Sequence, residues 1–384
     1  MDSCDLLIVG GGPAGSSCAW ALRDSGLDVL IVDRATFPRD KLCGGWITPQ
    51  VVNELELDVL DYGRQNTLQV IRGFRTGAIG QKEVELDCGR VVSYGIRRCE
   101  FDDYLLGRCG ARVREGYPIQ GIERDGDGWI INREIRARML IGAGGHFCPV
   151  AKHLGSDQEP QAVVAREVEF EMTSSEVASC TVRGEFPELY FCRDLVGYGW
   201  LFRKGNFLNI GLGRLDPHKL PEHLEEFASR MERLGKFRLE RQRRYSGHAY
   251  HLFGHSERRI VDDAVLLIGD SAGLAYPQSG EGIRPAVESG LMAAGIVASA
   301  NGDYRRAKLD RYACMLLERF ASGSGNSVGL AQRLPIPLRN YLGRQLLKTK
   351  PFCRKVVSDW FLHASDKPLR VTRIERVVAN PPAA

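Results

Sequence analysis

The sequence lacks the features that would place it across a membrane, in a disulfide-linked scaffold or at a zinc centre. No apolar run reaches the roughly 18 uncharged residues that a membrane-spanning helix needs, and no basic, apolar leader precedes the strand-like sequence that begins at Asp5. The 11 cysteines are odd in number, and no two are spaced as Cys-x-x-Cys. We therefore expect reduced thiols, a cytoplasmic location and no metal centre.

Charge is unevenly spread along the chain, although the total is only +4. Residues 331–384 hold 11 Lys or Arg against 3 Asp or Glu, and two short amphipathic patterns occur in the same stretch, within residues 338–361. Two interpretations stay open: peripheral contact with an anionic membrane surface or a phosphorylated ligand, and a solvated helical face. No aromatic-and-basic motif of a nucleic-acid-binding module is present, so we expect no nucleic acid partner.

The 384 residues, 43% hydrophobic and 26% charged, suffice for a large core and two intertwined domains. The first recognisable unit is a strand, a turn, a helix and a second strand over residues 5–33. Its strands, Leu6–Val9 and Val29–Val32, are continuous apolar runs. Such runs are typical of parallel strands that are buried on both faces.

The turn of this unit is a G-x-G-x-x-G sequence, residues 10–15. Gly10 permits the tight turn, Gly12 lets the backbone approach a pyrophosphate, and Gly15 lets helix and strand pack closely. The helix N-terminus offers free N–H groups to the phosphates, and Asp33 after the second strand is placed to accept hydrogen bonds from a ribose. The strand–turn–helix context predicts a dinucleotide site; a glycine turn without a ligand is the alternative.

A second motif, about 250 residues downstream, distinguishes FAD from NAD as the bound dinucleotide. Leu266–Gly273 is a buried strand that ends in Gly269-Asp270. A simple dehydrogenase has no need of this element, whereas the extended FAD molecule needs an acceptor for its ribityl chain. Asp270 suits that role, or that of a helix N-cap. Residues 277–283 then open a long helix whose dipole would stabilise an anionic reduced flavin. We therefore predict FAD as the cofactor.

Several stretches resemble known families. Residues 10–15, Asp33-Arg34, Arg98–Asp102 and Gly269-Asp270 resemble the para-hydroxybenzoate-hydroxylase-like flavoproteins, and residues 37–45, 197–202 and 276–283 resemble the geranylgeranyl reductase family. The resemblance covers residues 1–320 in the correct order. It implies hydride transfer from the N5 atom of reduced FAD to a prenyl double bond of a hydrophobic small-molecule substrate. It leaves open whether the external electron donor is NAD(P)H or a ferredoxin-like protein.

The pattern predicts an α/β protein with a glutathione-reductase-type Rossmann FAD-binding domain, an inserted antiparallel β-sheet substrate domain and a helical C-terminal segment. Alternating stretches such as Ala165–Met172 and Phe207–Gly213 predict the antiparallel sheet. We place the discontinuous FAD-binding domain at residues 1–75, 96–155 and 256–325. The sheet-rich substrate domain is expected at residues 76–95 and 156–255, and the basic helical segment at residues 326–384.

Pro38, Cys43 and Gly44 match the P-x-x-x-x-C-G loop of the reductase family, which the resemblance places beside the flavin ring. Cys43 would position the substrate or help to deliver a proton there; a small packing residue is the alternative. Arg98 would contact the FAD phosphates or fix the start of the helix at Asp102. The predicted cofactor-binding residues are Gly10, Gly12, Pro13, Ala14, Gly15, Asp33, Arg34, Lys41, Cys43, Gly44, Arg98, Gly269, Asp270, Gly280, Gly282 and Ile283.

Tyr198, Trp200 and Phe202 match the family's Y-x-W-x-F-P stretch. Alternation along a strand puts them on one face, which suits a long hydrocarbon chain; an ordinary core stripe is the alternative. Arg203 replaces the last proline of the stretch, and it either meets a phosphate or carboxylate head group or faces solvent. The predicted catalytic residues are Cys43, Gly44, Tyr198 and Trp200, and the predicted substrate-binding residues are Tyr198, Trp200, Phe202 and Pro277.

Two other functions stay open. The first is a flavin-dependent monooxygenase or halogenase of an aromatic or polyketide-like substrate. The sequence lacks the W-x-W-x-I-P stretch of the halogenases. It also has Gly144-Gly145-His146 where related hydroxylases carry Asp-Gly, which argues against a hydroxylase that uses NADPH directly. The second is a non-redox flavoprotein such as a cyclase.

Overall fold

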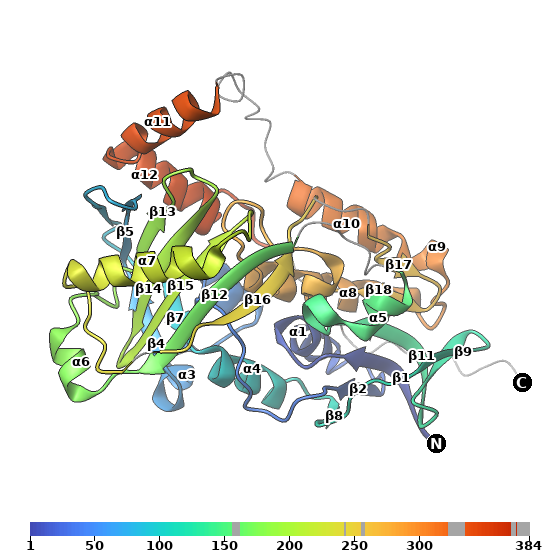
Figure 1. Ribbon diagram of the computed structural model, residues 1–384. Coiled ribbons are helices and arrows are strands. Elements are labelled where there is room, and N and C mark those ends of the chain that lie inside the picture. Colours follow the sequence, from blue (N-terminus) through green and yellow to red (C-terminus); the bar gives the residue numbers. More distant parts are fainter. Residues whose placement is uncertain (156–161, 242, 255–257, 322–334, 370–373, 375–384) are drawn as a thin grey trace, which may run out of the picture.

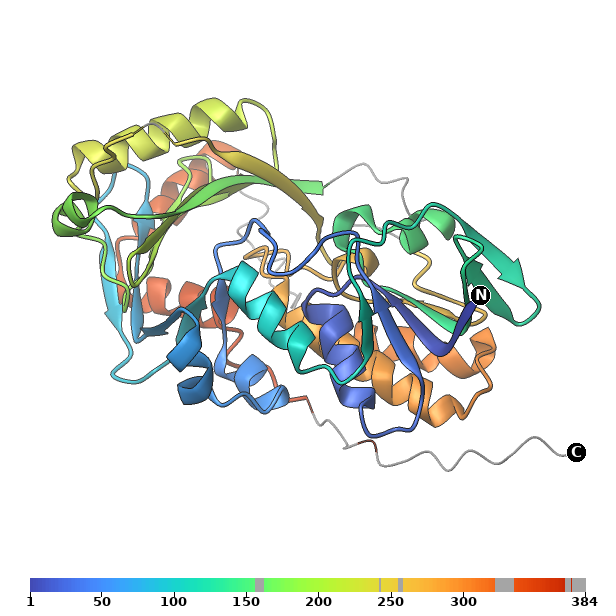
Figure 2. The same cartoon turned by 90° about the horizontal axis from the view of Figure 1, so that it is seen from below.

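The computed structural model describes residues 1–155, 162–241, 243–254, 258–321, 335–369 and 374. Two large sheets lie side by side, and the last helices of the chain pack back against the second sheet (Figure 1, Figure 2). In the part of the chain that the structure describes, no helix combines the length and the apolar content needed to cross a bilayer.

The first sheet is built on the predicted Rossmann unit. Its strands are β1 (Asp2–Val9), β2 (Val29–Val32), β8 (Arg112–Arg114), β9 (Ile122–Asp125), β10 (Gly128–Ile131), β11 (Ile135–Gly142), β17 (Val261–Asp262) and β18 (Val265–Leu267). They run in the order β17-β18-β11-β1-β2-β8, parallel except at β17, and the β9–β10 hairpin adds to β11. The apolar runs of β1 and β2 are buried between helices on both faces, which confirms the prediction of an α/β fold.

Helices pack around this sheet: α1 (Pro13–Leu22), α4 (Arg98–Gly107), α5 (Pro149–His153), α8 (Ile283–Ala300), α9 (Arg306–Leu309) and α10 (Arg311–Phe320). The pair α1 and α8 makes the closest helix contact of the group. A Cβ atom at Gly290 of α8 would lie 2.4 Å from the Ala14 carbonyl oxygen. Glycine at that position therefore brings together two helices whose N-termini are both in glycine-rich turns.

The second sheet has seven strands. Across the sheet they are β16 (Ser246–His251), β12 (Ala162–Glu171), β15 (Phe207–Arg214), β14 (Gly197–Lys204), β13 (Glu188–Phe191), β5 (Gly73–Ala78) and β6 (Val84–Asp87). The β13–β5 pair is parallel and the other pairs are antiparallel. Helix α7 (Leu220–Arg233) buries Leu224 and Phe227 on the outer face, and α6 (Ser174–Ser179) begins with a capping box at Thr173. The opposite, inner face of the second sheet is directed towards the first sheet.

A small third sheet connects the two large ones. It consists of β3 (Trp46–Ile47), β7 (Ser93–Ile96) and β4 (Leu68–Ile71), in that order, with helices α2 (Pro49–Glu54) and α3 (Val59–Gln65) beside it. Because β3 follows the predicted flavin-side loop directly, this sheet fixes where that loop ends.

The two amphipathic patterns near the C-terminus are helices α11 (Ile336–Leu346) and α12 (Lys350–Val356), and α12 continues into a π-helical turn, η5 (Val357–Phe361). Val356, Val357 and Phe361 are buried in a cluster with Trp46 and Phe191, next to the second sheet. Helix α11, in contrast, has no buried residue. The surface that residues 338–361 leave exposed for the predicted membrane contact comprises α11 and the outer side of α12, where Arg354 and Lys355 are exposed.

The second sheet takes its strands from residues 73–87 and 162–251, and the first sheet takes its strands from the segments before, between and after. The domain boundaries given above stay a prediction. Residues 156–161, 322–334, 370–373 and 375–384 of the predicted segments lie outside the described residues.

Candidate active site

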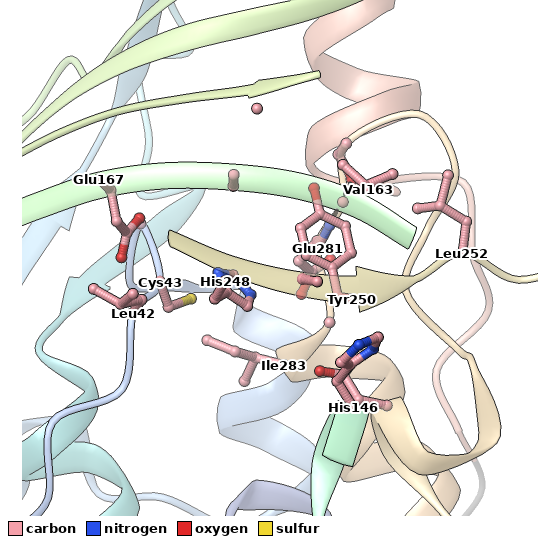
Figure 3. Close-up of a pocket in the computed structure, with 18 of the residues that line it drawn as sticks. Leu42, Cys43, His146, Val163, Glu167, His248, Tyr250, Leu252, Glu281 and Ile283 are labelled. Atoms are coloured by element: carbon pink, nitrogen blue, oxygen red, sulfur yellow. Dashed lines mark hydrogen bonds between the residues drawn. The ribbon is translucent and has the colours of Figure 1, made fainter. Parts of the chain in front are cut away.

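A cavity of about 960 Å³ lies between the first and second sheets. One side is lined by the glycine turns of the first sheet and the other by the inner face of the second (Figure 3). The predicted site residues line this cavity with two exceptions, Gly15 and Gly269, which pack directly behind it. The structure therefore brings the motifs at the two ends of the sequence to one place.

The glycine turn after β1 has the geometry that the motif predicts. Gly10 has φ +117°, and a Cβ atom there would lie 2.4 Å from the Ala143 carbonyl oxygen. A Cβ atom at Gly15 would lie 2.0 Å from the Gly10 carbonyl oxygen. Asp33 accepts hydrogen bonds from the backbone N–H groups of Gly11 (2.8 Å) and Ala35 (2.9 Å) while its side chain lines the cavity. Asp33 thus stabilises the turn and stays available to a ligand.

Below the turn lies a buried ion pair. Arg98 donates from Nε and Nη2 to the two carboxylate oxygens of Asp102, at 2.7 and 2.8 Å. Arg39 Nη2 lies 3.2 Å from the same carboxylate. Both roles considered for Arg98 are compatible with this geometry, because it pairs with Asp102 in the first turns of α4 and also lines the cavity.

The second glycine motif follows β18 (Val265–Leu267), and its Gly269 packs against Ala286 in the first turns of α8. Gly269 has φ +60° and donates its N–H to Ser289 Oγ (2.9 Å), and the Asp270 side chain next to it lines the cavity. Gly280 has φ +68°, and a Cβ atom there would lie 2.2 Å from the Tyr250 hydroxyl oxygen. The close approach of β16 therefore requires glycine in this turn.

The inner face of the second sheet carries what we call the aromatic face: Tyr198, Trp200 and Phe202 of β14. The predicted alternation holds, and all three line the cavity. A Cβ atom at Gly44 would lie 2.8 Å from Phe202 Cε2. Trp200 Nε1 donates to Asn209 Oδ1 (2.7 Å), and Asn209 Nδ2 donates to the Cys43 carbonyl oxygen (3.2 Å). The aromatic face and the Cys43-Gly44 loop are therefore held as one unit.

Burial shifts the pKa of several side chains in the cavity. It raises the pKa of Glu167 and of Glu281 to about 7 in each case. It lowers the pKa of His248 to about 3, with help from the positive charge of Lys41. Burial also raises the pKa of the Tyr198 hydroxyl well above its ordinary value. Burial thus disfavours charge on these four side chains.

Comparison with known proteins gives the family. The family model described as FAD binding domain matches residues 3–317. The menaquinone reductase of Mycobacterium tuberculosis is 31% identical over 363 residues, covering 88% of this chain and 85% of the relative. The chain is an FAD-dependent reductase of the geranylgeranyl reductase family. The digeranylgeranylglycerophospholipid reductase of Methanocaldococcus jannaschii is 27% identical over 319 residues, or 78% of each chain.

The fold of this reductase is also found in a solved structure. A geranylgeranyl bacteriochlorophyll reductase-like protein from Thermoplasma acidophilum matches with a TM-score of 0.71, at 21% identity, over 94% of this chain and 97% of that one. The two chains therefore share the arrangement of sheets described above.

The cavity of the reductase fits FAD. Helices α1 and α8 begin at Pro13 and Ile283, which both line the cavity. Neither N-cap glycine has a capping side chain, although in α8 Glu281 accepts the Arg284 N–H. Backbone N–H groups are thus left for the pyrophosphate and for the flavin edge. Asp33 and Asp270 are the carboxylates placed for the ribose and the ribityl chain. The contacts of single residues with FAD stay a prediction.

Sequence reasoning missed part of the reductase's cavity. Glu167 of β12 and His248 and Tyr250 of β16 line it, as do Leu347, Phe352, Val356 and Trp360 of the C-terminal helices, which we call the C-terminal wall. The amphipathic patterns predicted an apolar face near the C-terminus, but they did not predict that this face packs against the second sheet. Arg203 does not line the cavity; its Nε donates to the Gly205 carbonyl oxygen (3.0 Å), so it is not placed to meet a head group there.

Proposed function

We propose that this reductase saturates carbon–carbon double bonds in the isoprenoid chain of a prenylated lipid, with a prenyl quinone as the first candidate. The observation that carries the proposal is the aromatic face, which stands opposite the FAD-binding turns across one cavity. A reaction at a hydrocarbon double bond needs such an arrangement, because the substrate offers no polar group for recognition at the reacting carbons. The relatives described as menaquinone and digeranylgeranylglycerophospholipid reductases support this substrate class.

The residues of the chain perform the positioning. FAD, when bound and reduced, supplies the hydride for the double bond. Trp200 and Phe202 offer flat apolar surfaces to the isoprenoid chain, and the bond from Asn209 to the Cys43 carbonyl keeps that surface at a fixed distance from the loop. The C-terminal wall closes the same cavity with Leu347 and Val356. Together these side chains exclude water from the reacting carbons.

The partners follow from the same reaction. The flavin must be reduced again after each turnover, so we propose an external electron donor, either NAD(P)H or a ferredoxin-like protein. A prenylated lipid resides in a membrane, so we also propose that α11 rests on the membrane surface. Leu338, Tyr341 and Leu342 are between 41% and 53% exposed on α11, and Arg339 lies exposed among them. Gly343 and Leu347 at the end of α11 already line the cavity, so this surface is continuous with the site.

The test is an anaerobic single turnover. The FAD-loaded protein is reduced with dithionite and mixed separately with menaquinone in detergent micelles and with geranylgeranyl diphosphate, and the products are analysed by mass spectrometry. The samples are exposed to air before analysis, because a quinol returns to the quinone while a saturated chain keeps its two added hydrogens. A stable gain of two hydrogens is the expected result. A flavin that is reoxidised only by the quinone ring, or a hydroxylated product formed with oxygen, contradicts the proposal.

A pair of glycine variants tests the role of the aromatic face. A Cβ atom at Gly211 would lie 2.2 Å from Trp200 Cζ2, so Gly211→Ala must displace the indole. At Gly107 of α4, which does not line the cavity, an added Cβ atom would meet no atom within 4 Å. Displacement of the indole from the cavity wall predicts that G211A slows chain reduction about tenfold or more while FAD stays bound. G107A should react like the wild type.

A further inference from the structure

Glu167 lies beside Trp200 on the inner face of the second sheet. In the strand register, Glu167 of β12 pairs with Gly211 of β15, and Gly211 pairs with Trp200 of β14. Because Gly211 has no side chain, the indole occupies the space above it. A Cβ atom at Gly211 would lie 2.2 Å from Trp200 Cζ2 and 2.8 Å from Glu167 Cβ. The three residues form one row, in which a carboxyl group is adjacent to the aromatic face.

The Glu167 side chain is buried and directed into the site. Only 2% of the residue is exposed, although it lines the cavity. Figure 3 shows it projecting from β12 towards Leu42 and Cys43. The Cys43 backbone lies close enough to the carboxyl to lower its pKa in opposition to burial. Glu167 thus joins the aromatic face to the loop that the family motif places beside the flavin.

The surroundings of Glu167 favour its protonated form. Burial raises the pKa of Glu167 to about 7, against the opposing effect of Lys204. The Lys204 ammonium is itself bound by Glu169 and by the Ile96 carbonyl oxygen (2.9 Å), so it is engaged elsewhere. The titratable groups around Glu167 on all packed elements are Lys41 and Cys43 in the loop, Glu169 on β12, Tyr198 and Lys204 on β14, and His248 and Tyr250 on β16.

Three other ionisable side chains of the cavity, Tyr198, Tyr250 and His248, are poorer proton donors. Burial raises the pKa of both Tyr198 and Tyr250, so neither hydroxyl releases a proton readily. The lowered pKa of His248 leaves its imidazole neutral. Glu281 has a raised pKa as well, but it is in the turn before α8 and accepts the Arg284 N–H (3.1 Å), away from the aromatic row. Glu167 is the carboxyl in the row with Trp200, whereas Glu281 belongs to the turn that Tyr198 contacts through the Ser279 carbonyl oxygen.

We propose that Glu167 is the proton donor that completes reduction of the double bond, an inference that rests on the proposed function. One alkene carbon receives a hydride, with its electron pair, from the reduced flavin, which becomes oxidised. The other carbon receives the Glu167 proton. The π bond is broken, two C–H bonds are formed, and Glu167 is left as a carboxylate that regains a proton from solvent before the next turnover.

The first test measures the proton on Glu167 without turnover. Infrared difference spectra of the oxidised FAD-loaded protein are recorded between about pH 6 and about pH 9, a range above the ordinary pKa of exposed carboxyls, for Glu167→Gln and for Glu171→Gln, an exposed position on the same strand. Glu54 and Glu281 are also raised to about 7, so they contribute the same kind of band in both variants. The E171Q spectrum should contain one carboxylic C=O component more than the E167Q spectrum. Identical spectra would overturn the inference.

The second test follows the reaction. In the anaerobic single turnover, E167Q should form the saturated product about 100-fold more slowly than wild type. Reoxidation of its flavin by oxygen should be unchanged, and E171Q should match wild type. The wild-type rate should fall as pH rises through about 7, where the Glu167 carboxyl loses its proton, while the E167Q rate is independent of pH in this range.

A shorter acid keeps the test valid if E167Q folds poorly. Glu167→Asp retains a proton to donate, so its rate should lie between those of wild type and E167Q. If wild type itself leaves menaquinone and geranylgeranyl diphosphate unsaturated, the proposed function fails and this inference with it. If wild type saturates the chain and E167Q does so equally fast, only the inference fails.

Discussion

The two sides of the cavity recognise their ligands in different ways. The cofactor side uses backbone: glycines at positions where a Cβ atom would lie within 2.4 Å of a carbonyl oxygen, and uncapped helix N-termini. The sheet side uses side chains: the aromatic face, Glu167 and the C-terminal wall, supplied by segments that are between about 150 and 350 residues from the first glycine turn. One side is therefore a property of a local turn, and the other is a property of the assembled fold.

This difference predicts which substitutions separate FAD binding from substrate reduction. Changes at the glycine turns should remove the flavin and with it all activity. Changes on the sheet side should leave a folded protein that still binds FAD but reduces its substrate at a different rate. The predictions below test that division, beginning with the largest effect.

Gly10→Ala should cost the reductase its cofactor. The added Cβ atom would lie 2.4 Å from the Ala143 carbonyl oxygen at a residue whose φ is +117°. Overpacking and backbone strain together cost about 4 kcal/mol, which corresponds to roughly a thousandfold weaker FAD binding. Gly295→Ala, on α8, is the control, since an added Cβ atom there would meet no atom within 4 Å and the residue does not line the cavity. Fluorescence titration of the apoprotein with FAD measures both, and equal affinities would contradict the division.

Glu167→Gln should make the folded protein more stable at alkaline pH. The carboxyl pKa is 4.5 in the unfolded chain and about 7 in the folded one. The stability that the protonated form provides is fully present below pH 4.5 and is lost as pH rises to about 7, about 3 kcal/mol in total. Denaturant unfolding at pH 8 should therefore favour E167Q over wild type and over E171Q, and the difference should vanish near pH 4. A difference that does not change with pH would show that Glu167 is not protonated on folding.

Phe361→Leu should loosen the cluster that packs behind the C-terminal wall without releasing FAD. The Phe361 ring is fully buried, with its centroid 5.7 Å from that of Trp46 and 5.3 Å from that of Tyr198. Loss of these edge contacts should lower the free energy of unfolding by about 2 kcal/mol. Leu346→Ala, at an exposed position of α11, should change it by less than about 0.5 kcal/mol. Urea unfolding with flavin absorbance as a second signal checks both expectations.

Arg339→Gln should weaken membrane contact slightly. One basic side chain near an anionic surface contributes about 1 kcal/mol, so binding should fall about fivefold. Flotation with vesicles of phosphatidylglycerol and phosphatidylcholine measures the effect, and pure phosphatidylcholine vesicles should show no difference. Lys152→Gln, on α5 and distant from α11 in Figure 1, serves as the control. An equal loss for both variants would mean that α11 is not the contact surface.

The same division explains what could be predicted from the sequence. The Rossmann unit, the glycine turns and the alternation in β14 depend on neighbours within a few residues. They can therefore be recognised from the sequence alone. Glu167 alternates with Glu169 and Glu171, a pattern that suggests a solvent face. It is buried because β15 places Gly211, and through it Trp200, beside it. Strand register between distant segments cannot be read from one sequence, and neither could the packing of α12 against the second sheet.

The C-terminal helices also set an order of assembly. Trp46, Phe74 and Phe191 are covered by Val356, Val357 and Phe361, residues that the ribosome adds after both sheets and α8 are complete. Until then a broad aromatic surface of the nascent chain is bare, and such surfaces promote association between chains. A chaperone that shields hydrophobic surface would therefore bind the nascent chain longest in the interval between the synthesis of α8 and the synthesis of α12.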